Sequence, residues 1–168
     1  MSLDAEELRR RLIRGIDDVP LEREQRAPLY DSVGARLARG TAARKLGASI
    51  DTVAPGMRSC PYHAHHGQEE LFFIVEGEGT LRVAGQRLAV KAGDVIFIPP
   101  GPEYPHQLIN TSEAPLKYLS VSTRESPELV EYPDSGKYLA SARFEGTDGG
   151  VFHVQRAQAG LDYWDGEP

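Results

Sequence analysis

The segment YHAHHGQEELFFIVEG, residues 62–77, decides the fold class of this 168-residue chain. The sequence has five histidines, and three of them lie within four residues at the start of this segment. A glutamate pair and an apolar run follow, which is typical of a buried strand. Side chains two residues apart in a strand point to the same side, so His63 and His65 share a face and could hold one metal ion.

A second segment, GDVIFIPPGPEYPHQLIN (residues 93–110), places another histidine about forty residues downstream. His106 follows a turn rich in glycine and proline, and Asn110 lies four residues further on. Either Glu69 or Glu70 could turn its carboxylate towards the histidine pair. Neutral imidazole and carboxylate oxygen together suit Zn, Fe, Mn, Ni or Cu. The two segments therefore predict a metal site built from distant parts of the chain.

The rest of the sequence predicts an all-β core. Short apolar or alternating runs, each closed by Gly, Pro or Asn, recur about every ten residues, which is typical of a sandwich or barrel. The expected strands span residues 45–53, 70–77, 79–85, 86–93, 94–101, 106–110 and 116–123. The single cysteine, Cys60, excludes an intrachain disulfide and a multi-thiolate metal site.

Residues 1–43 read as a helix followed by an irregular arm. Leu8, Leu12 and Ile16 have helical spacing and predict a helix over residues 4–18, whereas residues 19–43 show no period. We expect the barrel over residues 44–125 and a C-terminal extension, residues 126–168, that packs on the barrel. No run reaches the length of about 20 apolar residues that a membrane helix needs.

The two histidine segments resemble the two sequence motifs of the cupins, G-x5-H-x-H-x3–4-E-x6-G and G-x5-P-x-G-x2-H-x3-N. The matching residues are Gly56, His63, His65, Glu70 and Gly77 in the first motif, and Gly93, Pro99, Gly101, His106 and Asn110 in the second. The resemblance covers residues 56–110 directly and implies a double-stranded β-helix, a jelly-roll barrel with the metal ligands inside. More narrowly, the chain resembles a group of single-domain bacterial cupins without an assigned substrate.

The resemblance implies His63, His65, Glu70 and His106 as ligands of a divalent transition metal, namely Fe, Mn, Zn or Ni. It favours Glu70 over Glu69, because only Glu70 keeps six residues before the closing glycine. The second motif departs from the family spacing by two residues, and strict spacing would put Tyr104 in the place of His106. We choose His106, because His-x3-Asn is intact and an insertion of two residues preserves the face of the strand.

The resemblance leaves the reaction open among oxygenation, decarboxylation and isomerisation on a small polar or anionic metabolite. Glu103 and Tyr104 are the candidate acid–base residues. A non-catalytic module that binds or senses a small molecule in the same pocket is the alternative. The net charge of −6 argues against a nucleic-acid partner. We expect a cytoplasmic homodimer with no membrane partner.

Overall fold

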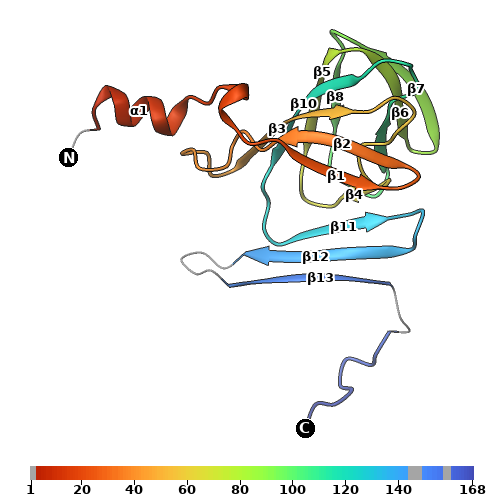
Figure 1. Ribbon diagram of the computed structural model, residues 1–168. Helices are drawn as coiled ribbons and strands as arrows, with labels where there is room; N and C mark the ends of the chain where they lie inside the picture. The colour runs from red at the N-terminus through yellow and green to blue at the C-terminus, as the bar shows by residue number, and fades with distance from the viewer. Residues whose placement is uncertain (1–2, 144–148, 157–159) are drawn as a thin grey trace.

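The computed structural model describes residues 3–143, 149–156 and 160–168, and most of these residues lie in β-strands (Figure 1). The largest sheet has the order β1-β2-β3-β10-β5-β8. Its strands are β1 (Glu22–Arg26), β2 (Tyr30–Ala35), β3 (Leu46–Val53), β10 (Leu116–Thr123), β5 (Glu70–Glu76) and β8 (Val95–Ile98). A second sheet has the order β7-β6-β9. It consists of β7 (Gln86–Lys91), β6 (Glu78–Val83) and β9 (His106–Ile109).

The hydrophobic core lies between these two sheets. Alternate residues of the central strands are buried, as the pleat of a half-buried strand requires. Ile74 of β5 and Leu116 of β10 are fully buried, and they pack with Leu81 of β6 and Leu108 of β9 in one cluster. The paired sheets around one core are the double-stranded β-helix expected from the sequence.

A third sheet, the C-terminal sheet, lies beneath the barrel in Figure 1 and has the order β13-β12-β11-β4. Its strands are β13 (Gly150–Arg156), β12 (Lys137–Arg143), β11 (Glu128–Tyr132) and β4 (Ala64–His65). Strand β4 belongs to the first histidine segment, and Val130 of β11 is in register with His65. The C-terminal extension is therefore hydrogen-bonded directly to the backbone of the candidate site.

The N-terminal region differs from the sequence expectation in two ways. Residues 19–43, expected to be irregular, contain the antiparallel pair β1 and β2, and β2 joins the barrel sheet through β3. All five residues of β1 are exposed, so this strand has no alternating pattern to reveal it. The helix expected over residues 4–18 ends early, because α1 spans Ala5–Leu12 and only the short 3-10 helix η1 (Ile16–Asp18) follows.

The early end of α1 has a simple physical cause. The helix buries none of its residues and stands away from the barrel in Figure 1, so no tertiary packing supports a longer one. Gly15, which disfavours a helix interior by about 1 kcal/mol relative to Ala, lies between α1 and η1. Within the described residues, no helix is long and apolar enough to span a bilayer.

The turn chemistry follows the sequence prediction. Gly77, Gly93 and Gly101 all have positive φ angles. A side chain at Gly77 would also collide with the backbone carbonyl of Pro115. Both the positive φ angle and this close contact therefore require glycine at position 77. Asn110 is fully buried, and its Nδ2 donates to the carbonyl oxygens of Val53 (2.9 Å) and Ala114 (2.7 Å). It holds the loop before β10, as expected.

Candidate metal centre

The backbone itself brings the two histidine segments together. His63 and His106 form an antiparallel bridge in which the N–H of His63 donates to His106 O (3.1 Å) and the N–H of His106 donates to His63 O (2.7 Å). Directly opposed residues of an antiparallel pair project their side chains to the same side. The two imidazoles therefore lie against each other, with ring centroids 4.6 Å apart.

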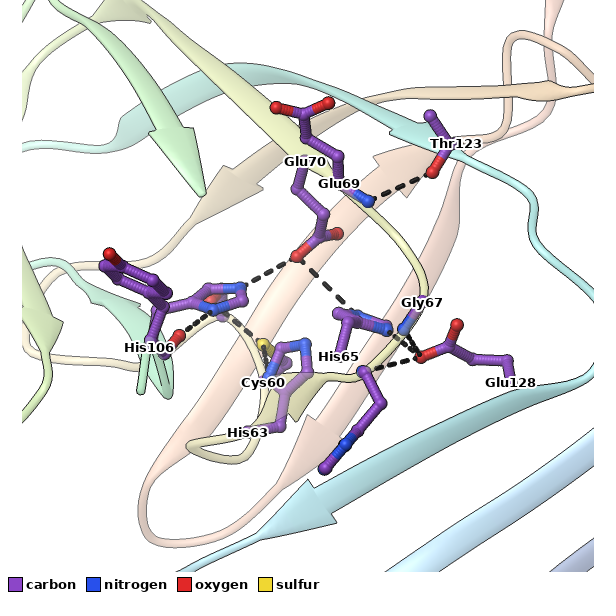
Figure 2. A network of polar contacts seen from close by, with 12 residues as sticks. Cys60, His63, His65, Gly67, Glu69, Glu70, His106, Thr123 and Glu128 are labelled. Carbon is purple, nitrogen blue, oxygen red and sulfur yellow. Dashed lines mark hydrogen bonds and ion pairs between the residues drawn. The ribbon is translucent and has the colours of Figure 1, made fainter. Parts of the chain in front are cut away.

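Glu70, the first residue of β5, points its carboxylate at these histidines (Figure 2). Its Oε2 lies 2.8 Å from Nε2 of His106 and 3.6 Å from Nε2 of His65. Possible ligand atoms of His63, Glu70 and His106 all lie within 4.8 Å of one another. His65 lies beside this group, with its ring centroid 4.9 Å from that of His63. The structure thus places His63, Glu70 and His106 in one compact group, with His65 beside it.

The hydrogen bonds of the ring nitrogens leave the Nε2 atoms free to bind a metal. Nδ1 of His63 lies 2.8 Å from Pro61 O, and Nδ1 of His106 lies 3.1 Å from Tyr104 O. A carbonyl oxygen only accepts, so in both rings Nδ1 carries the proton and Nε2 of the neutral ring presents a lone pair. Nε2 of His106 and Oε2 of Glu70 are buried, face each other at 2.8 Å, and make no other hydrogen bond among the described residues. With Nε2 deprotonated, both atoms could bind the same cation.

The charges of the site agree with this donor set. Burial is the largest effect on the pKa of His65 and lowers it, so its imidazole is neutral, as a metal ligand must be. Burial alone would raise the pKa of Glu70, but the neighbouring imidazoles, His106 first, outweigh it and lower this pKa. A neutral His65 and an ionised Glu70 are ligand types that suit Fe, Mn, Zn or Ni.

Glu128 of the C-terminal sheet contacts the segment that carries His65, and this role was not predicted from the sequence. Its side chain is 4% exposed, and its Oε1 accepts hydrogen bonds from the N–H groups of His66 (3.1 Å) and Gly67 (3.3 Å). The same oxygen lies 3.4 Å from Nδ1 of His65. A side chain at Gly67 would approach Oε2 of Glu128 within 2.7 Å, so glycine makes room for this carboxylate. A signal was present, because Glu128 alternates with the apolar Val130 along one strand.

A cavity of about 430 Å³ opens over the metal centre. His63, Glu70 and His106 line its floor, and residues of β1 lie at its rim. Asp51 and Tyr118, which are opposite each other in β3 and β10, form part of the wall. The hairpin of β1 and β2, which the sequence did not predict, therefore helps to enclose the space beside the candidate metal centre.

Asp51 is a buried carboxyl group in the wall of this cavity. Burial raises the pKa of Asp51, and the Ser49 hydroxyl, which donates to Oδ2, and the charge of Arg36 offset only part of this effect. Gly34 of β2 lies so close that a side chain there would collide with Asp51 Oδ1. The sequence carried a weak signal, an acidic residue two positions from Ser49 in a strand with no other charged residue.

The remaining candidate residues lie outside the site or are chemically quiet. Tyr104 is 42% exposed, Glu103 is also exposed, and neither side chain lines the metal cavity; Tyr104 contributes only its carbonyl oxygen. His106, not Tyr104, faces Glu70. Glu69 is exposed, and Figure 2 shows its side chain turned away. Burial raises the pKa of Cys60 to about 12, so its thiol stays protonated.

Comparison with known proteins identifies the family. Residues 49–122 match the cupin domain family, and the chain therefore contains a cupin domain. Among curated proteins it is 37% identical to the uncharacterized protein MJ1618 of Methanocaldococcus jannaschii, over 41% of this chain and 57% of that protein. It is 36% identical to an oxalate-binding protein of Thermotoga maritima, over 40% of this chain and 54% of that protein. The chain thus spans little more than half the length of the curated relatives it matches.

Solved structures extend the similarity to a larger part of the chain than residues 49–122. A sugar phosphate isomerase of the cupin superfamily from Silicibacter pomeroyi aligns with a TM-score of 0.72 at 22% identity, covering 87% of this chain and 96% of that one. A predicted oxalate decarboxylase from Thermotoga maritima aligns with a TM-score of 0.57 at 27% identity, covering 68% of this chain and all (100%) of that one. The first of these similarities shows a shared fold.

The contacts of Glu128 predict that it stabilises the protein from the C-terminal sheet. Glu128→Ala removes the acceptor of two backbone N–H groups and should lower the free energy of unfolding by about 1–3 kcal/mol. Glu128→Gln keeps one acceptor oxygen and should cost less. The matched control is Glu131→Ala on the same strand, an exposed residue beside His66. Urea denaturation measures all three, and equal stabilities of Glu128→Ala and Glu131→Ala would contradict the role assigned to Glu128.

The buried carboxyl of Asp51 predicts a pH-dependent effect on stability. Its pKa is higher in the folded protein than in the unfolded chain, so its contribution to stability is present at low pH and is lost as the pH rises through the folded-state value. Asp51→Asn should therefore stabilise the protein relative to wild type at pH 7, with a gain that shrinks towards pH 4. Thermal unfolding between pH 4 and 7 measures the difference, with the exposed Asp17→Asn as control. A difference that is constant over this range would refute the assignment.

Proposed function

We propose that this cupin is a metal-dependent enzyme that acts on a small anionic metabolite in its barrel. The observation that carries the proposal is the buried contact between Glu70 Oε2 and His106 Nε2, 2.8 Å apart and next to His63. Neither atom has another hydrogen-bond partner among the described residues. With Nε2 deprotonated, both atoms offer a lone pair that a bound cation would accept.

His63, His65, Glu70 and His106 are the proposed ligands of a divalent transition metal, Fe, Mn, Zn or Ni. Protein ligands on one side of the ion leave coordination positions open towards the cavity, which is the arrangement of a catalytic site. When bound, the metal supplies a Lewis acid that polarises a carbonyl or carboxylate oxygen of the substrate. The fold does not choose among oxygenation, decarboxylation and isomerisation, and the proposal leaves the reaction open among these three.

The residues of the chain supply orientation and proton transfer. Glu128 fixes the ring of His65 through its contact with Nδ1, as a carboxylate behind a metal-binding histidine commonly does. Asp51 is the proposed acid–base group, because it lines the cavity and its raised pKa brings proton exchange closer to neutral pH. This proposal replaces Glu103 and Tyr104, whose side chains lie outside the cavity.

A non-catalytic binding module is the second candidate function. It is favoured by one comparison, the 36% identity to an oxalate-binding protein over 67 residues. Both candidates use the same metal and pocket, and they differ in whether a bound acid is converted. A metal-loaded protein that oxalate stabilises against heat without consuming it would support the binding module.

A homodimer is proposed for the assembly. Strand β13 is the edge of the C-terminal sheet, and all its residues are exposed. Phe152 and Val154 on this strand are 71% and 50% exposed, respectively. An exposed edge strand with apolar side chains is a ready site for pairing with a second chain. Sedimentation at micromolar concentration should therefore give the mass of two chains, and a monomer would oppose it.

Metal binding tests the proposed enzyme. The double variant His63→Ala with His106→Ala should lose affinity for Zn²⁺ or Mn²⁺ at least about 100-fold, because it loses two ligands. Isothermal titration of the metal-stripped protein measures the affinity, and elemental analysis gives the stoichiometry, expected to be one ion per chain. His153→Ala, on the exposed strand β13, is the matched control and should bind like wild type.

Two results would overturn this prediction. A wild-type chain that takes up no transition metal on titration would remove the basis of the enzyme. A double variant with the affinity of His153→Ala would show that a metal binds elsewhere.

A further inference from the structure

A second cavity adjoins the metal centre and opens between the barrel and the C-terminal sheet. Its volume is about 980 Å³. Four residues line both this cavity and the one over the metal centre, namely Arg36, Ser49, Glu70 and Ser120. The two spaces therefore adjoin each other along these four residues.

Four arginines border this second cavity, and each comes from a different part of the chain. Arg36 follows β2, Arg44 precedes β3, Arg124 follows β10 and Arg143 ends β12. All four are exposed. None of them takes part in an ion pair within the part of the chain that the structure describes. In a chain with a net charge of −6, this is a concentration of unpaired positive charge.

Carboxylates do not cancel this charge. Among the described residues that line the cavity, only Glu70 and Glu125 are acidic. The carboxylate of Glu70 points at His65 and His106 and is the proposed metal ligand. Asp51 of the adjoining cavity interacts with the charge of Arg36, which leaves Glu125 against Arg44, Arg124 and Arg143. The outer end of the cavity is therefore electropositive and attracts an anion.

A row of hydroxyl groups connects the metal centre to the arginines. Ser120 and Ser122 alternate along β10 and, like Arg124 two residues later, line the cavity. Ser122 is in register with Glu70 of β5, and Ser120 is in register with Ser49 of β3. The path from Glu70 to Arg124 thus offers hydroxyl donors and acceptors rather than apolar surface.

We propose that the second cavity binds the phosphate group of a phosphorylated, polyhydroxylated small molecule, whose other end reaches the metal centre. The guanidinium group pairs with phosphate oxygens through two parallel hydrogen bonds, and the three terminal oxygens of a phosphate can serve several arginines at once. Serine hydroxyls suit the hydroxyl groups of the molecule between its ends. The volume lies in the range of about 300–1,000 Å³ that is typical of small-molecule sites. The metal end of this inference rests on the proposed function.

The test is titration of the metal-loaded, full-length protein with inorganic phosphate and with glucose 6-phosphate. Arg124→Gln combined with Arg143→Gln should weaken the binding of both at least about 10-fold. Arg87→Gln, an exposed arginine of β7 that lines neither cavity, is the matched control and should change nothing. Glucose 6-phosphate should bind more tightly than phosphate alone, and glucose more weakly than its phosphate ester.

Several outcomes overturn the inference. Phosphate that does not bind, or that binds equally to the double variant and to Arg87→Gln, excludes the arginine site. Glucose 6-phosphate that binds no more tightly than phosphate excludes the polyhydroxylated part. Circular dichroism verifies that the variants remain folded.

The same titration in the metal-stripped protein distinguishes an error in the proposed metal site from an error in the proposed phosphate site. Loss of metal binding with arginine-dependent phosphate binding retained would refute the proposed enzyme and leave the phosphate site standing. Intact metal binding with no arginine-dependent phosphate binding would refute only the phosphate site.

Discussion

The backbone bridge between His63 and His106 is the constraint on which the site depends. Two reciprocal hydrogen bonds of 3.1 and 2.7 Å hold residues that lie more than forty positions apart in directly opposed register. Register fixes the side of the sheet to which a side chain points, and a shift of one residue would turn an imidazole away. The two rings lie side by side, and Glu70, at the start of β5, completes a compact group of possible ligand atoms with them.

The C-terminal sheet is part of this arrangement and not an appendage. It includes β4, the strand of the first histidine segment, and it brings the buried carboxylate of Glu128 against His65. It also contributes Arg143 to the cavity beside the metal. Stability, ligand orientation and the proposed phosphate site thus all draw on residues beyond the segment, residues 49–122, that matches the cupin domain family. Substitutions in this sheet should therefore alter the geometry of the candidate metal centre.

Local signals in the sequence predicted the barrel and the proposed ligands. The features that the sequence did not predict depend on contacts between distant parts of the chain. Alternating strands and turn glycines such as Gly77 are read within a few residues, and His106 was recognisable from the spacing to Asn110. The strand β1 escaped because all its residues are exposed and polar or charged. Asp51 and Glu128 were not predicted, because their roles depend on which distant strands lie beside them. The helix was predicted too long because apolar spacing does not tell whether a partner surface exists.

The central claim is that one metal ion joins the two histidine segments and Glu70. Crystals of the metal-loaded protein, measured at the absorption edge of the bound metal, test it most directly. The account predicts one anomalous peak per chain, about 2.0–2.2 Å from Nε2 of His63, Nε2 of His106 and a carboxylate oxygen of Glu70. A structure without such a peak, or with the peak outside this group of side chains, would contradict it.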